Sequence, residues 1–95
     1  MQSLEPKDPT ERYAVEFKFD RVLSSITDAT CTVSLISGTD AAYADLLDGA
    51  AEVVGASAYQ RIKSGVAGCV YKIRCEATDG TEVYVLTASI GVVTA

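Results

Sequence analysis

The chain contains no histidine and no tryptophan, and both of its prolines, Pro6 and Pro9, lie among the first ten residues. Without histidine it lacks the commonest general base and metal ligand at neutral pH. Cysteine catalysis then lacks its usual activator, and burial on an apolar strand face makes the thiols of Cys69 and Cys75 inert. We therefore expect a protein that is not an enzyme.

Basic residues and long apolar runs are also scarce. Eight Lys and Arg face thirteen Asp and Glu, which gives a formal charge of −5. Nucleic acid binding needs clustered cations that release counterions, so no nucleic acid partner is expected. No run approaches the roughly 20 apolar residues of a membrane helix, and the N-terminus lacks the apolar segment of a signal peptide. We expect no membrane partner and a cytoplasmic site of synthesis.

No motif for a metal or a phosphate is present. The spacing from Cys69 to Cys75 fits no zinc site. The three aspartates within 40–48 lack the ligand spacing of a calcium loop, and solvated loop carboxylates are the better interpretation. Gly65 and Gly68 precede an expected strand, whereas phosphate loops open a helix. We predict no cofactor and no metal.

Three cysteines, Cys31, Cys69 and Cys75, are an odd number in a chain without a recognisable secretion signal. Reduced, buried thiols are therefore the first expectation. Because immunoglobulin domains bridge two strands across their sheets, a disulfide from Cys31 to Cys69 or Cys75 stays open as an alternative.

The composition is that of one folded domain, with 48% hydrophobic and 22% charged residues in 95. Residues 1–11 have no hydrophobic period and are predicted to be a flexible N-terminal arm. Apolar residues alternate strictly from Tyr13 to Phe19 and again from Ala29 to Leu35, which predicts two half-buried strands. Residues 12–95 form the predicted folded unit.

The segment between Gly38 and Gly55 is ambiguous. Its apolar residues also fit a helical spacing, with Asp40 as the N-cap. Because a glycine inside a helix is unfavourable, we favour two short strands, Tyr43–Leu47 and Ala51–Val54. Another strand is expected at Ser57–Lys63.

The clearest local feature is Asp79-Gly80, which favours a two-residue type I′ hairpin turn with Thr78 opposite Thr81. Its register places six side chains on one dry face: Cys69, Tyr71, Ile73, Cys75, Tyr84 and Leu86. About seven short strands separated by turns predict an all-β, immunoglobulin-like antiparallel β-sandwich. Gly65–Gly68 followed by Tyr71 resembles the tyrosine corner of fibronectin-like domains, with an ordinary core tyrosine as the alternative.

The candidate contact residues are apolar or aromatic side chains on strand faces that the alternation assigns outward. They are Tyr59, Val83 and Val85. Scattered exposed apolar residues occur on any protein, so the pattern permits an interface without establishing one.

The order of features resembles the phage fiber-tail adaptor family over nearly the whole chain. In the first half the similar elements are Lys7-Asp8-Pro9, the aromatic strand Tyr13–Phe19, Leu23 and Ile26-Thr27-Asp28-Ala29. In the second half they are Gln60, Gly65, Val66-Ala67-Gly68, Tyr71, Cys75 and Thr78-Asp79-Gly80. Where the family tends to carry Asp-Trp-Xaa-Xaa-Trp-Leu, this chain has Phe17, Phe19 and Leu23.

This resemblance implies a non-enzymatic bacteriophage structural protein, a tail or fiber-tail connector that binds other virion subunits. The protein would be in the bacterial cytoplasm during assembly and then in the virion, with a homo-oligomer in the particle left open. The alternative is a surface decoration or adhesion module for carbohydrate or the host surface, for which Tyr43 and Tyr59 are the candidate aromatic residues.

Overall fold

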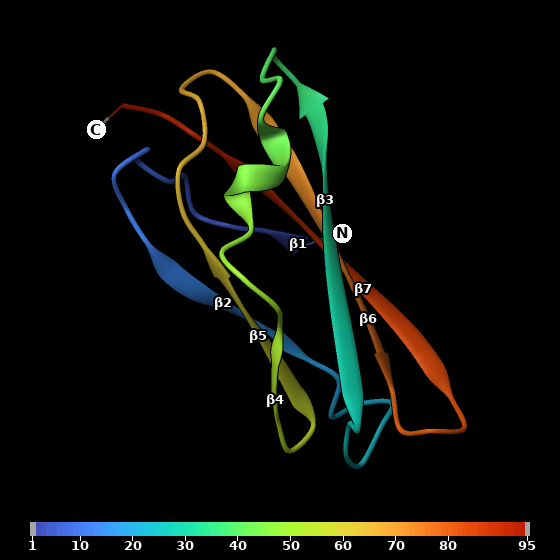
Figure 1. The fold of residues 1–95 in the computed structure, drawn as a ribbon. Helices are drawn as coiled ribbons and strands as arrows, with labels where there is room; N and C mark the ends of the chain where they lie inside the picture. Colours follow the sequence, from blue (N-terminus) through green and yellow to red (C-terminus); the bar gives the residue numbers. More distant parts are fainter. Residues whose placement is uncertain (1, 95) are drawn as a thin grey trace.

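Seven strands in two packed sheets make up the protein in the computed structural model, which describes residues 2–94 (Figure 1). The first sheet has the order β1-β7-β6-β3, and the second has the order β2-β5-β4. The strands are β1 (Gln2–Ser3), β2 (Tyr13–Lys18), β3 (Asp28–Ser37), β4 (Glu52–Val54), β5 (Ser57–Ile62), β6 (Val70–Thr78) and β7 (Val83–Gly91), with a 3-10 helix η1 (Tyr43–Leu46). The predicted all-β sandwich is confirmed. No helix among the described residues is long and apolar enough to cross a membrane.

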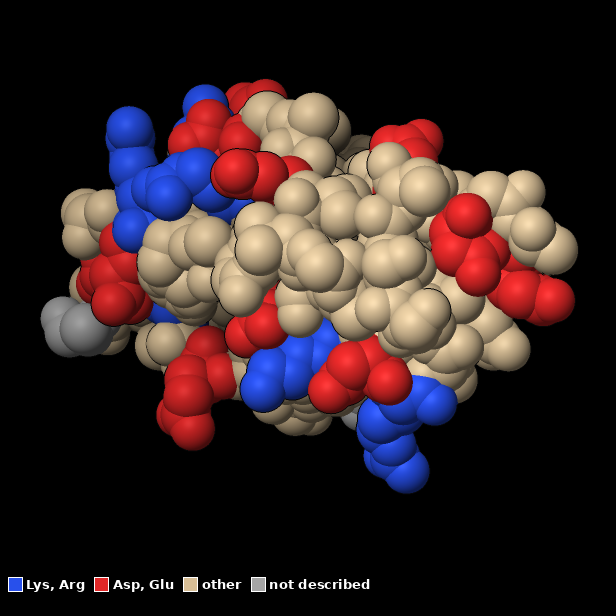
Figure 2. All heavy atoms as spheres, turned by 90° about the horizontal axis from the view of Figure 1, so that it is seen from below, with Lys and Arg blue, Asp and Glu red and all other residues tan. Residues whose placement is uncertain are grey.

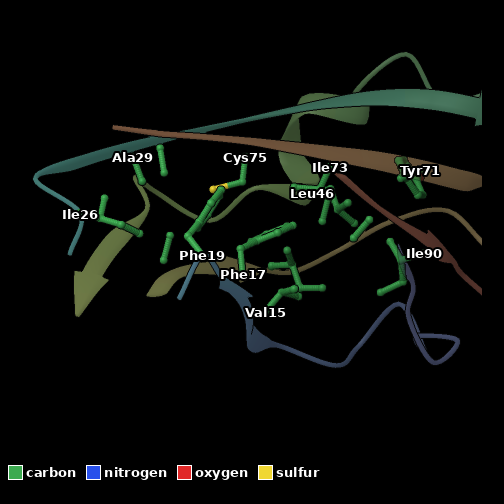
Figure 3. Close-up of a cluster of buried hydrophobic side chains, with 14 of the residues drawn as sticks. Val15, Phe17, Phe19, Ile26, Ala29, Leu46, Tyr71, Ile73, Cys75 and Ile90 are labelled. Atoms are coloured by element: carbon green, nitrogen blue, oxygen red, sulfur yellow. The ribbon is translucent and has the colours of Figure 1, made fainter. Parts of the chain in front are cut away.

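The core lies between the sheets and follows the alternation in the sequence. Val15 and Phe17 on β2, and Phe19 just after it, extend toward Ile73 and Cys75 on β6 (Figure 3). These five side chains are at most 6% exposed. Strand β5 likewise buries Ala58, Gln60 and Ile62. Both alternating segments of the first half form the expected strands.

The tyrosine corner is present. The hydroxyl of Tyr71 accepts a hydrogen bond from the backbone N–H of Val66 at 2.9 Å and donates one to Asp40 Oδ2 at 2.7 Å. Burial, with the hydrogen bond to Asp40, raises the pKa of Tyr71 to about 12. One hydroxyl therefore ties the loop before β6 to the segment that follows β3, as in immunoglobulin-like sandwiches.

The N-terminal segment differs from the expected flexible arm. Strand β1 pairs in parallel with Ala88 and Ser89 of β7, and Leu4 N–H donates to Ser89 O. Lys7 is fully buried, and its Nζ donates to the backbone carbonyls of Asp8 and Ser64. These carbonyls replace the water that the ammonium loses, which is how a lysine is accommodated inside. The segment predicted to be free is held to the edge of the sheet.

The segment at 38–56 also differs from the prediction in part. The first expected strand, Tyr43–Leu47, is instead η1 followed by an isolated bridge between Leu47 and Ile62. Asp40 Oδ1 accepts the N–H of Ala42 just before η1, so its carboxylate favours a local turn over an extended chain. The second expected strand, Ala51–Val54, is confirmed as β4.

The β6–β7 hairpin has the predicted faces but a register that differs by two residues. Thr78 pairs with Val83, not Thr81, so residues 79–82 form a four-residue loop. The Asp79 carboxylate accepts the N–H groups of both Thr81 and Glu82, which stabilises the longer loop over a type I′ turn. Because the shift is an even number, every side chain stays on its predicted face.

Candidate protein-binding edge

The first half of β7 is apolar and exposed on both faces. Val83 and Val85 point away from the facing sheet and are 58% and 40% exposed. Tyr84 and Leu86 lie on the inner face, yet they are 38% and 37% exposed. The sequence placed these two side chains on a dry face, and this expectation is wrong because the facing sheet does not cover this part of β7.

The same segment has an open backbone edge. Strand β7 pairs with β6 on one side, while on the other side β1 covers only Ala88 and Ser89. Within residues 2–94, no strand pairs with the outer edge of Val83–Leu86. This part of the chain projects with the β6–β7 hairpin at one end of the molecule (Figure 1).

The hydrogen-bond pattern shows which backbone groups face outward. Glu82 O accepts from Asp79 N, and Val92 N donates to Cys69 O, so even-numbered residues of β7 bond toward β6. Ser89 O and Gly91 O instead accept bonds from the N-terminal segment, so odd-numbered residues bond outward. Alternation along an antiparallel pair then directs the N–H and C=O of Val83 and Val85 to the open edge, whereas Thr87 already lies beside Gln2 of β1.

Two other loops adjoin the hairpin and enlarge the uncharged area. Ile26 N donates to Gly55 O, and Thr27 N donates to Thr78 O. The β2–β3 loop, the β4–β5 turn and the hairpin therefore meet at one end of the molecule. Val22 in the β2–β3 loop and Val54 at the end of β4 are 48% and 57% exposed. Seen from this side, the centre of the surface is broadly uncharged, with acidic and basic groups mainly around it (Figure 2).

Of the three predicted contact residues, the structure brings two together. Val83 and Val85 lie two positions apart on the same face of β7, but Tyr59 lies in β5 of the other sheet. The Tyr59 hydroxyl donates to Glu16 Oε2 at 3.2 Å, and this hydrogen bond raises the pKa of Tyr59. Its phenol is half-buried and engaged within its own sheet, so Tyr59 is not part of the edge.

A separate groove of about 400 Å³ lies between the N-terminal segment and β2. Its lining residues are Gln2, Leu4, Glu5, Pro6, Glu11, Tyr13, Ala14, Val15 and Glu16. Two of its glutamates are already engaged, since Glu11 accepts the N–H of Asp8 and Glu16 accepts the hydroxyls of Ser57 and Tyr59. Among residues 2–94, no three His, Cys, Asp or Glu side chains are grouped so that they could hold a metal ion.

Compared with models of protein families, with curated proteins and with solved structures, the chain has no match.

Proposed function

We propose that this chain is a non-enzymatic structural protein of a bacteriophage virion, a tail or fiber-tail connector that binds a neighbouring subunit through the open edge of β7. The observation that carries the proposal is the run Val83–Leu86, four consecutive apolar side chains, all more than a third exposed, in the part of β7 that no described outer strand covers. Soluble proteins usually protect such an edge with charge, proline or a covering loop. An edge left unprotected is suited to pairing with another chain.

The mode of contact is the addition of one strand. An extended segment of the partner would bond to the outward N–H and C=O groups of Val83 and Val85, while the side chains of these two valines pack against those of the partner. The hairpin loop carries the partly exposed Asp79 and the exposed Glu82, and the chain has a net charge of −5. A partner strand flanked by lysine or arginine therefore fits better than a second copy, which would repel the first.

The resemblance to fiber-tail adaptors supplies the biological setting of this proposal. In a tail, each subunit is repeated about a symmetry axis, so a weak contact made by one β7 edge is strengthened by the other copies. The protein would be made in the bacterial cytoplasm and end in the virion.

The test is incorporation into particles of the V83E/V85E double variant. We expect the variant to fold normally, with a change in the free energy of unfolding below about 1 kcal/mol, because both side chains are exposed. Its incorporation should fall at least tenfold, since the two introduced carboxylates would lose their water at the interface with the partner strand. The matched control is V66E/V93E, which alters two valines, 44% and 48% exposed, beyond the far end of the β6–β7 ladder.

Normal incorporation of a folded V83E/V85E protein would overturn the proposal. Equal loss in both double variants would also overturn it, because the effect would then not be specific to the β7 edge. The purified wild-type chain could also form concentration-dependent dimers that V83E/V85E abolishes. In that case the partner at the β7 edge is a second copy of this chain and not a different protein. Sedimentation velocity distinguishes that outcome.

A further inference from the structure

Two of the three cysteines, distant in sequence, are direct neighbours in the first sheet. Cys31 on β3 pairs with Cys75 on β6 in the antiparallel register. Both contribute to the core, where Cys75 is fully buried and Cys31 is half-buried. They therefore lie side by side on the inner face of one sheet, and the expected alternative of a bridge between sheets does not describe them.

The pair occupies the kind of position at which a cross-strand disulfide fits. The backbone N–H and C=O groups of odd-numbered residues in β6 bond toward β7, so those of even-numbered residues bond toward β3. Thr78 is an example, since its carbonyl accepts the N–H of Thr27. Cys31 and Cys75 are consequently a non-hydrogen-bonded pair. In such pairs the Cα atoms are about 4.5 Å apart, at the short end of the range that a disulfide spans.

The environments of the two thiols differ in a way that assigns an order of reaction. Hydrogen bonding with the Cys75 thiol lowers the pKa of Cys31, against the smaller effect of burial. The same interaction, together with burial, raises the pKa of Cys75. Strand β3 is at the edge of its sheet, so an oxidant in solvent reaches Cys31 first. Cys69 is a separate case, because its Sγ contacts the carbonyl of Thr39 at 3.5 Å.

We propose that Cys31 and Cys75 form a reversible disulfide that locks β3 to β6 when the protein meets a peroxide or a disulfide oxidant. With hydrogen peroxide, the Cys31 thiolate attacks one oxygen, the O–O bond breaks, hydroxide leaves and a sulfenic acid forms. The Cys75 sulfur then attacks the Cys31 sulfur, the S–O bond breaks, and the Cys75 proton leaves with the hydroxyl as water. Two thiols are oxidised, and one peroxide is reduced to two waters.

The structural consequence is a covalent link between an edge strand and a central strand. It closes the chain from residue 31 to residue 75, a loop that includes β4, β5 and the tyrosine corner. Cross-linking a long loop restricts the unfolded chain, so the oxidised protein should be the more stable form. A link at the short end of the permitted geometry should also remain reducible.

The experiment treats the folded, full-length protein with hydrogen peroxide or oxidised glutathione and digests it without reduction. Trypsin cuts after Arg21, Arg61, Lys63, Lys72 and Arg74, so each cysteine falls in a different peptide. We expect the mass to fall by two hydrogens, one linked pair joining peptides 22–61 and 75–95, and Tm to rise by on the order of 10 °C. Dithiothreitol should reverse all three changes.

Two variants complete the test. C69A should still form the link, whereas C31A should show no oxidant-dependent rise in Tm and no linked pair. The proposal fails if the wild-type link joins Cys69, if Cys31 keeps a stable glutathione adduct that Cys75 does not displace, or if the link appears only after unfolding in urea. Each of these results is visible in the same peptide map, even if one variant folds poorly.

Discussion

The two halves of β7 belong to one continuous strand and have opposite environments. In the second half, Ala88 and Ile90 face the core and are at most 1% exposed. In the first half, Tyr84 and Leu86 lie on the same face of the strand and are more than a third exposed. Alternation determines the face on which a side chain lies, but burial depends on whether another layer lies opposite.

The largest effect should come from truncating one apolar side chain in each half. Ile90→Ala should lower the free energy of unfolding by about 2–5 kcal/mol, because it opens a cavity in a packed core. Leu86→Ala should lower it by less than about 1 kcal/mol, because its side chain is already partly in water. Urea denaturation measures both values, and equal losses would show that both halves are covered.

Removal of the Tyr71 hydroxyl should have the next largest effect. Tyr71→Phe leaves the Val66 N–H and the Asp40 carboxylate without this partner, which should cost about 1–3 kcal/mol. Tyr84→Phe is the matched control in the exposed half and should change the stability by less than about 0.5 kcal/mol. Thermal and urea unfolding measure the stability of both variants. A loss for Tyr84→Phe as large as the loss for Tyr71→Phe would contradict this account.

Acid should weaken the hairpin loop through Asp79. Hydrogen bonds from the backbone N–H groups of Glu82 and Thr81 hold the pKa of Asp79 below its usual value of 3.8. Because the folded pKa is the lower one, this stabilisation is present above the unfolded pKa and is lost as the pH falls through the folded pKa. Asp79→Asn should therefore flatten the loss of stability that begins as the pH falls through about 4 and continues below it. Identical urea midpoints against pH in both proteins would contradict this expectation.

The smallest effect should be that of Val85→Thr in the open half, within about 0.5 kcal/mol. Val92→Thr, at a side chain only 1% exposed, should cost more because its hydroxyl would be buried. Urea midpoints of the two variants are sufficient to compare them. If Val85→Thr were the more damaging change, the first half of β7 would have to be covered.

Much of the fold could be predicted because it depends on local pattern. The alternation from Tyr13 to Phe19 fixes the inward face of β2, and the spacing of Gly65–Gly68 and Tyr71 indicated the corner. The hairpin faces were predicted correctly, although the loop is two residues longer, since a side chain such as Asp79 can satisfy N–H groups that a two-residue turn does not contain.

The rest depends on contacts between distant parts of the chain. A lysine is normally exposed, so nothing in the sequence indicates that Lys7 is buried beneath the carbonyl of Ser64. The pairing of Cys31 with Cys75 requires the register of two strands that are not adjacent in sequence. The candidate edge was half predicted: Val83 and Val85 were identified from their outward positions, whereas Tyr84 and Leu86 were missed because their exposure depends on the width of the facing sheet.

The central claim, that Val83–Leu86 forms an open edge, is tested most directly by amide hydrogen exchange in the isolated protein, read by NMR. The account predicts an alternation: fast exchange at Val83 and Val85, whose N–H groups face solvent, and slow exchange at Tyr84 and Leu86, whose N–H groups bond to β6. Uniform slow exchange over all four amides would show that the edge is already covered, and it would contradict the account.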